Sequence, residues 1–126
     1  MDKNDKPKKG EEWKKFTQRE LEEVLDLHEQ FLKGARGGER AKLAMCDLSY
    51  LDFSGRDVRR ADFVGAILSH CDFEECKLEE ANLFASDMQG AVLVRANLDR
   101  ADLRGASLSG ANLTLASLVD CDMRDG

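Results

Sequence analysis

Four cysteines are the residues of this sequence that could bind a metal or form disulfides: Cys46, Cys71, Cys76 and Cys121. A metal site usually draws its thiolates from C-x-x-C pairs, with His or further Cys nearby, and this sequence contains no such pair. All four cysteines occupy one position of a five-residue pattern in which most other copies carry Ala or Ser. A thiol in that position is expected to fill space as a slightly larger Ala. We therefore predict no metal site, no disulfide and no cofactor.

The histidines and aspartates do not form a catalytic set either. His28 lies on the apolar stripe of a predicted helix, and His70 lies at a predicted turn. The many Asp residues recur at regular intervals, which indicates a repeated structural role: accepting hydrogen bonds from backbone N–H groups at turns. Without a nucleophile–base pair or a glycine-rich phosphate loop, we predict no catalytic residues and no enzyme.

Most of these residues belong to a part of the chain whose sequence pattern repeats every five residues. In "ANLDRADLRGASLSGANL" (96–113) a Leu occurs at every fifth residue, which fits neither the period of an α-helix nor that of a β-strand. The same pattern divides residues 41–125 into seventeen quintets without insertion or deletion. The third residue of every quintet is a large apolar one, and the first is small in fifteen of the seventeen.

This pattern predicts an all-β solenoid. Residues two apart in an extended segment point the same way, so the first and third residues of a quintet face inward and the second faces out. The last two residues turn the corner. Each side is so short that it can pair only with the sides above and below, about 4.8 Å away. The core is expected to contain the third residues, among them Leu43, Phe53, Phe63, Phe73, Leu83, Leu93, Leu98 and Leu103.

Several quintets resemble a known family. The segments "ADFVG" (61–65), "ANLFA" (81–85), "ANLDR" (96–100), "ADLRG" (101–105) and "ANLTL" (111–115) are similar to the A(D/N)LXX repeats of pentapeptide-repeat proteins. The resemblance implies a right-handed quadrilateral β-helix with four quintets in each coil. Residues 41–126 would then form about four coils.

The residues before the repeats predict a helix that covers the end of the solenoid. Residues 1–16 are polar and Lys-rich and are expected to form a mobile tail, whereas 17–34 form an N-terminal α-helical cap and 35–40 a Gly-rich connector. Thr17 and Glu20 have the spacing of a capping box. An apolar stripe follows on one helix face, which predicts a helix over 18–33.

Arg56 departs most from the repeat, because it occupies a first position that should hold a small inward residue. We expect its side chain to reach outward and meet a carboxylate, either Asp57 or a Glu of the helix.

Two surfaces are candidates for contact with other proteins. The first is an apolar patch edged by arginines, formed by Met45, Val64, Phe84, Arg104 and Arg124. The second is the C-terminal coil, which has no predicted cover and is expected to form a two-fold homodimer interface through Leu113, Leu115, Leu118, Val119 and Met123.

The charge distribution narrows the classes of partner that this protein can bind. The net charge of −6 belongs entirely to residues 41–126, since 1–40 carry ten acidic and ten basic side chains. An acidic rod argues against direct binding of nucleic acid. Without an apolar run of membrane or signal-peptide length, we expect a cytoplasmic protein that does not bind membranes.

These observations favour a non-enzymatic interaction or scaffold module that presents a rigid rod to an unidentified protein partner. The resemblance implies one alternative, a DNA mimic that modulates DNA gyrase, as quinolone-resistance members of the family do. A purely structural repeat domain is the other alternative.

Overall fold

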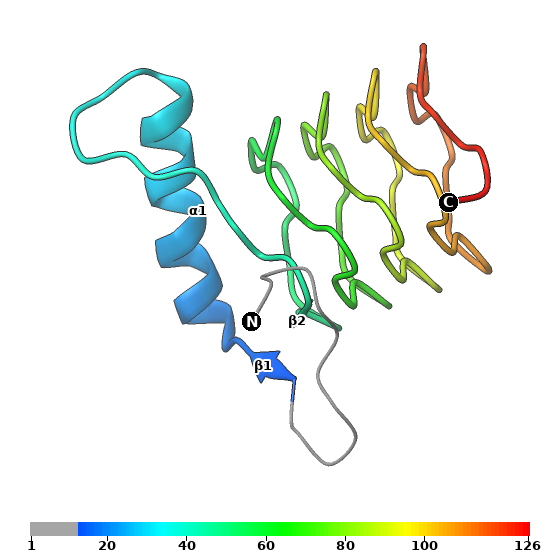
Figure 1. Ribbon diagram of the computed structural model, residues 1–126, viewed down its shortest axis with the longest axis horizontal. Coiled ribbons are helices and arrows are strands. Elements are labelled where there is room, and N and C mark those ends of the chain that lie inside the picture. Colours follow the sequence, from blue (N-terminus) through cyan, green and yellow to red (C-terminus); the bar gives the residue numbers. More distant parts are fainter. Residues whose placement is uncertain (1–12) are drawn as a thin grey trace.

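The protein is described by a computed structural model over residues 13–126, and Figure 1 shows a helix standing beside a stack of coils. The named elements are β1 (Lys14–Lys15), α1 (Gln18–Leu32) and β2 (Cys46–Asp47). The stack begins next to α1 and extends away from it toward the C-terminus (Figure 1). Residues far apart in sequence therefore lie directly above one another.

The repeat is built from parallel bridges between residues twenty apart, from Lys42↔Asp62 to Asp102↔Asp122. Four quintets therefore complete one coil. Each side is bonded to both neighbours: the Asp62 amide donates to the Ala41 carbonyl at 3.0 Å, and the Phe63 amide donates to the Asn82 carbonyl at 2.8 Å. A coil at either end of the stack has only one such neighbour.

The corners have the same structure in most quintets. The Asp or Asn at the second position accepts a hydrogen bond from the amide two residues on, as Asp62 does from Val64 at 3.1 Å and Asn82 from Phe84 at 3.2 Å. The predicted role of the regular Asp residues is confirmed. The fifth residue has a positive φ, for example 62° at Arg60. The side-chain acceptor stabilises this left-handed turn by satisfying an amide within it.

The interior is a column of third-position side chains. The eight residues predicted for the core are at most 3% exposed. Phe53 stacks on Phe73 of the next coil with ring centroids 4.7 Å apart, and it meets Phe63 edge-on at 5.8 Å. The burial weakens toward the C-terminus, where Leu108, Leu113 and Leu118 are only partly buried.

α1 begins and ends with specific capping motifs. Thr17 and Glu20 form the predicted capping box, with the Thr17 amide bonded to Glu20 Oε1 at 2.8 Å. At the other end Gly34 has a φ of 71°, and the amides of Gly34 and Ala35 donate to the carbonyls of Phe31 and Gln30. This Schellman motif requires a left-handed residue at Gly34. The helix ends one residue before the predicted range of 18–33.

α1 and the solenoid share one core. Leu21, Leu25 and His28 of α1 are fully buried, and the two leucines belong to the same apolar cluster as the solenoid interior. α1 thus lies across the first coil.

The expected mobile tail over 1–16 is wrong for Lys14 and Lys15. These residues form β1, which pairs in parallel with β2 in the register Lys14↔Cys46 and Lys15↔Asp47. Backbone hydrogen bonds hold β1 at the edge of the first coil, so its polar side chains give no sign of the pairing. Residues 1–12 of the predicted tail lie outside the described residues.

Candidate interaction surfaces

The edge of the first coil facing α1 is bonded by side chains of the helix on two of its sides. On the side that contains Asp52, the Asp52 amide donates to Gln18 Oε1 at 2.9 Å, and Gln18 Nε2 donates to the Asp52 carbonyl at 2.8 Å. The carboxamide of Gln18 therefore replaces the backbone of a neighbouring strand. Such pairing satisfies an edge that would otherwise be open.

Glu29 of α1 bonds to the side of the first coil that contains Arg56 and Asp57. Its carboxylate accepts from the Asp57 amide at 3.1 Å and from Arg56, whose Nε lies 3.0 Å from Oε2. Arg56 also contacts Asp26 at 2.6 Å. Burial alone would raise the pKa of Glu29, but the hydrogen bonds from Arg56 and Asp57 outweigh burial and lower it. The predicted contact between Arg56 and a helix Glu is confirmed, while Asp57 pairs with Arg59 instead.

His28 joins α1 to the solenoid through both ring nitrogens. Nδ1 accepts from the Ala41 amide at 2.9 Å, and Nε2 lies 2.8 Å from the Arg59 carbonyl. A carbonyl cannot donate, so Nε2 carries the proton and the ring is neutral. Burial lowers the pKa of His28, and the bond to Arg59 only partly offsets it. Both nitrogens are used in structural contacts, which leaves His28 no catalytic role.

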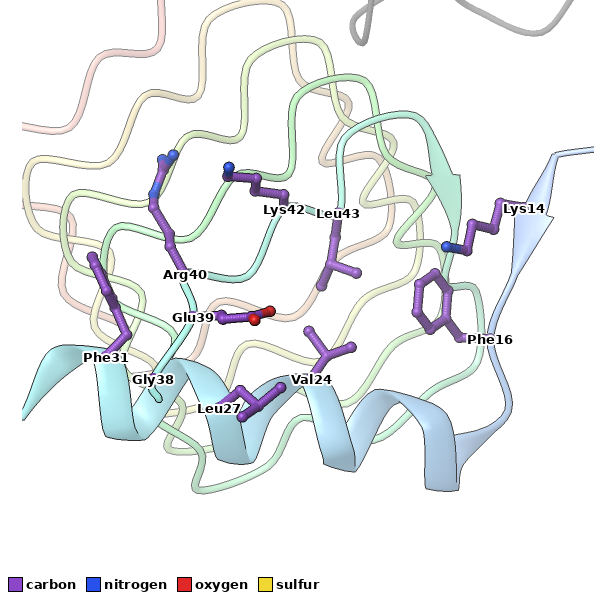
Figure 2. A pocket seen from close by; sticks show the side chains of 10 residues that line it. All are labelled: Lys14, Phe16, Val24, Leu27, Phe31, Gly38, Glu39, Arg40, Lys42 and Leu43. Carbon is purple, nitrogen blue, oxygen red and sulfur yellow. The ribbon is translucent and has the colours of Figure 1, made fainter. Parts of the chain in front are cut away.

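A pocket of about 560 Å³ lies where α1 and the connector meet the side of the first coil that contains Lys42. In Figure 2, Val24 and Leu27 point into it from α1, and Leu43 points toward them from the coil. Apolar residues from α1 and the segment before it, from the connector and from the coil line it together with three basic residues and one acidic residue: Phe16, Val24, Leu27, Phe31, Gly38 and Leu43, then Lys14, Arg40 and Lys42, and Glu39. Sequence reasoning missed this pocket, because its residues come from three separate segments.

The predicted contact patch around Phe84, here called the Phe84 patch, differs from the open apolar surface that the sequence predicted. Phe84 and Val64 are half-buried. Arg104 lies over the Phe84 ring, with Cζ 5.3 Å from the centroid, and its guanidinium is held by Asp102 at 2.8 Å. The arginine therefore covers the ring. Met45 is also half-buried, whereas Arg124 is exposed and pairs with Asp122. The role of the patch in protein contact stays a prediction.

The last coil, residues 106–125, exposes apolar side chains. Leu115 is 70% exposed, Val119 59% and Met123 53%. Leu113 and Leu118, predicted for the same interface, are half-buried. The backbone amides of Leu108, Leu113 and Leu118 have no acceptor among the described residues, although equivalent amides in earlier coils bond to the next coil.

The cysteines lie inside the column, as their positions predict. Cys46, Cys71 and Cys76 are buried and Cys121 is half-buried, all as free thiols. Burial raises the pKa of Cys71 to about 12, so its thiol stays protonated at neutral pH. Within residues 13–126, no group of three or more His, Cys, Asp or Glu side chains is placed to hold a metal ion.

The comparisons with known proteins agree with this architecture. The family model for pentapeptide repeats matches eight copies, over residues 46–83 and 86–125. The chain therefore belongs to the pentapeptide-repeat family, and membership implies a right-handed quadrilateral β-helix. No match is found among curated proteins.

Solved structures of the same family resemble this chain. A pentapeptide-repeat protein of the Arabidopsis thaliana thylakoid lumen is 42% identical, covering 61% of this chain and 53% of its own, with a TM-score of 0.61. This chain thus spans about half the length of that protein. A protein of Nostoc PCC 7120 is 26% identical over 88% of this chain and 84% of its own, with a TM-score of 0.67.

A plasmid-mediated fluoroquinolone resistance protein is more distant. It is 22% identical over 66% of this chain and 45% of its own, with a TM-score of 0.35, and this likeness carries no functional argument. In the described part of the chain, no helix has the length and apolar character needed to cross a membrane. The expected cytoplasmic location stays a prediction.

Proposed function

We propose that this protein is a non-enzymatic interaction module that presents a rigid β-helical rod to protein partners. The observation that carries the proposal is the concentration of exposed apolar side chains on one coil. Of the five large apolar residues that are exposed within the described part of the chain, three lie on the last coil: Leu115, Val119 and Met123. An apolar surface of this kind, next to a polar rod, is typical of a protein contact site.

In this proposal α1 is the N-terminal cap of a rod of a little more than four coils. The buried Leu21 and Leu25, with the bonds from Gln18, His28 and Glu29, support this role. A capped first coil is required because solenoid repeats are stabilised mainly by their neighbours.

We infer that the last coil binds a second copy of the chain. A two-fold contact would place Leu115, Val119 and Met123 against the same residues of the other copy. Their exposed fractions, all above one half, leave room for substantial burial.

Sedimentation velocity at tens of micromolar tests this interface. We expect the parent chain to be a dimer and Val119→Glu to be a monomer, because a carboxylate cannot be buried there unpaired. Val92→Glu is the matched control, since Val92 is an exposed Val on an earlier coil, and it should remain a dimer. A monomeric parent, or equal behaviour of the two variants, would overturn the proposed interface.

The gyrase-directed alternative has less support. The second-position carboxylates accept hydrogen bonds from their own turns, and Arg59, Arg104 and Arg124 form ion pairs with three of them. The negative charge is thus partly neutralised along the rod, which weakens any imitation of duplex DNA.

A further inference from the structure

One side of the first coil has an edge without a partner among residues 13–126. β1 covers the side that begins with β2, Gln18 bonds to Asp52 on the next side, and Glu29 bonds to the Asp57 amide on the last side. On the remaining side, neither the amide nor the carbonyl of Lys42 has a hydrogen-bond partner within residues 13–126. An exposed strand edge of this kind is a template for pairing with another chain.

The next coil shows what such an edge can bind. One coil further, Asp62 occupies the position equivalent to Lys42. Its carbonyl accepts from the Leu43 amide at 2.8 Å, and its amide donates to the Ala41 carbonyl at 3.0 Å. A strand placed beside Lys42 would make the same two kinds of bond. β1 already does so on the neighbouring side, where Lys14 and Lys15 pair in parallel with β2.

The pocket described above lies against this free edge. Lys42 and Leu43 form one wall, and the apolar face of α1 with Val24 and Leu27 forms the opposite wall (Figure 2). In an extended peptide, alternate side chains point the same way. A strand bonded to Lys42 can therefore direct every second side chain into the apolar part of the pocket.

The charge of the pocket favours an acidic occupant. Lys14, Arg40 and Lys42 line it, and none of them forms a salt bridge with a described residue. Arg40 uses its Nε to bond the Arg60 carbonyl at 2.7 Å. Glu39 is the single carboxylate among the lining residues. This cationic rim stands out on a protein with a net charge of −6.

We propose that the Lys42 edge binds an extended acidic segment of a partner protein by strand addition. Backbone bonds to Lys42 hold the segment, apolar side chains enter the pocket, and acidic side chains meet the three cations. The inference rests on the proposed function as an interaction module, but it concerns the end of the rod opposite the inferred dimer interface.

Fluorescence anisotropy with the full chain and short, end-blocked, labelled peptides tests the proposal. The probe is a peptide of alternating Glu and Val, which we expect to bind saturably and more weakly at high salt. The same peptide with N-methylated Val residues loses the backbone N–H donors of those residues, and a Lys/Val peptide reverses the charge. Both should bind at least about tenfold more weakly.

Two variants place the binding at Lys42. Lys42→Glu should weaken binding of the Glu/Val peptide by about tenfold or more, because it reverses a charge at the site. Lys77→Glu is the control, since Lys77 is another exposed lysine at the second position of a quintet, and it should change affinity less than about twofold. Circular dichroism and thermal melting check that both variants fold.

Several results would overturn the proposal. The first is no saturable binding of the Glu/Val peptide. The second is that the N-methylated peptide binds as tightly as the Glu/Val peptide, or that laurate competes equally well for the site. Either result would mean a site for anionic amphiphiles without strand pairing. The third is equal weakening by Lys42→Glu and Lys77→Glu. None of these results changes the sedimentation of the parent chain, so a failure here is distinct from a failure of the proposed dimer.

Discussion

The two ends of the rod show what a stack of short strands needs. At the N-terminal end, side chains of α1 bond to the edge of the first coil, and the Leu48 side chain is fully buried. At the C-terminal end, Leu108 occupies the equivalent position on the same side, and it is only half-buried. The residue type is the same at both ends, so the difference comes from the cover that β1 and α1 provide at the N-terminal end.

The largest expected effect comes from a matched pair of Leu→Ala substitutions, one at each end of the rod, which tests this contrast. Leu48→Ala removes a fully buried side chain and should cost about 2–5 kcal/mol of unfolding free energy. Leu108→Ala should cost about 1 kcal/mol or less, because its site is already open to water. Urea unfolding followed by circular dichroism measures both. Equal losses would contradict the idea that the C-terminal coil is poorly packed.

A smaller effect is expected from the arginines at the two ends. Arg56→Ala breaks the contacts from the first coil to Glu29 and Asp26 and leaves a half-buried carboxylate without its cation, so we expect a loss of about 1–2 kcal/mol. Arg124→Ala removes an exposed ion pair within its own quintet and should leave the urea midpoint nearly unchanged.

Urea midpoints of both arginine variants, with Glu29→Gln and the double variant Arg56→Ala/Glu29→Gln, complete a thermodynamic cycle. Additive losses in that cycle would show that Arg56 and Glu29 do not act together.

The smallest effect is a pH dependence of stability between pH 7.5 and 5 that arises from His28 at the N-terminal end. Burial lowers the pKa of His28 in the folded protein, so the unfolded chain binds the proton more readily. The stability contributed by neutral His28 is therefore complete above pH 6.5, the ordinary value, and decreases as the pH falls below it. One group contributes at most about 1.4 kcal/mol per pH unit.

Urea midpoints between pH 7.5 and 5 measure this dependence. His28→Gln should remove it, because Gln can accept from Ala41 and donate to Arg59 without titrating. His70→Gln, at an exposed turn, should leave it in place. A pH dependence that persists in His28→Gln would assign the effect to another group.

Much of the fold could be predicted from the sequence because the repeat is local. The five-residue spacing of Leu98, Leu103 and Leu108 can be read from the sequence without any knowledge of the structure. Thr17 with Glu20 likewise marks the start of α1, since both members of the motif lie within one turn. The Arg56 contact was predictable from its violation of the pattern.

Other features had no signal in the sequence. β1 is a pair of lysines that joins the first coil through backbone atoms, which every residue possesses. The cover of Phe84 depends on Arg104, one coil away, and on the Asp102 that holds it. The pocket requires α1, the connector and the first coil to meet, and no single stretch of chain contains that geometry.

The sequence by itself determined the period, the inward and outward positions of each quintet and the helix that precedes them, because these follow from steric and hydrogen-bonding preferences of neighbouring residues. Only the tertiary structure decided which edges are satisfied and which stay open. Edge pairing depends on backbone groups brought together from distant segments, and side-chain identity does not encode where those segments meet. The Lys42 edge, which is unpaired within residues 13–126, and the exposed coil at Val119 are therefore properties of the assembled rod.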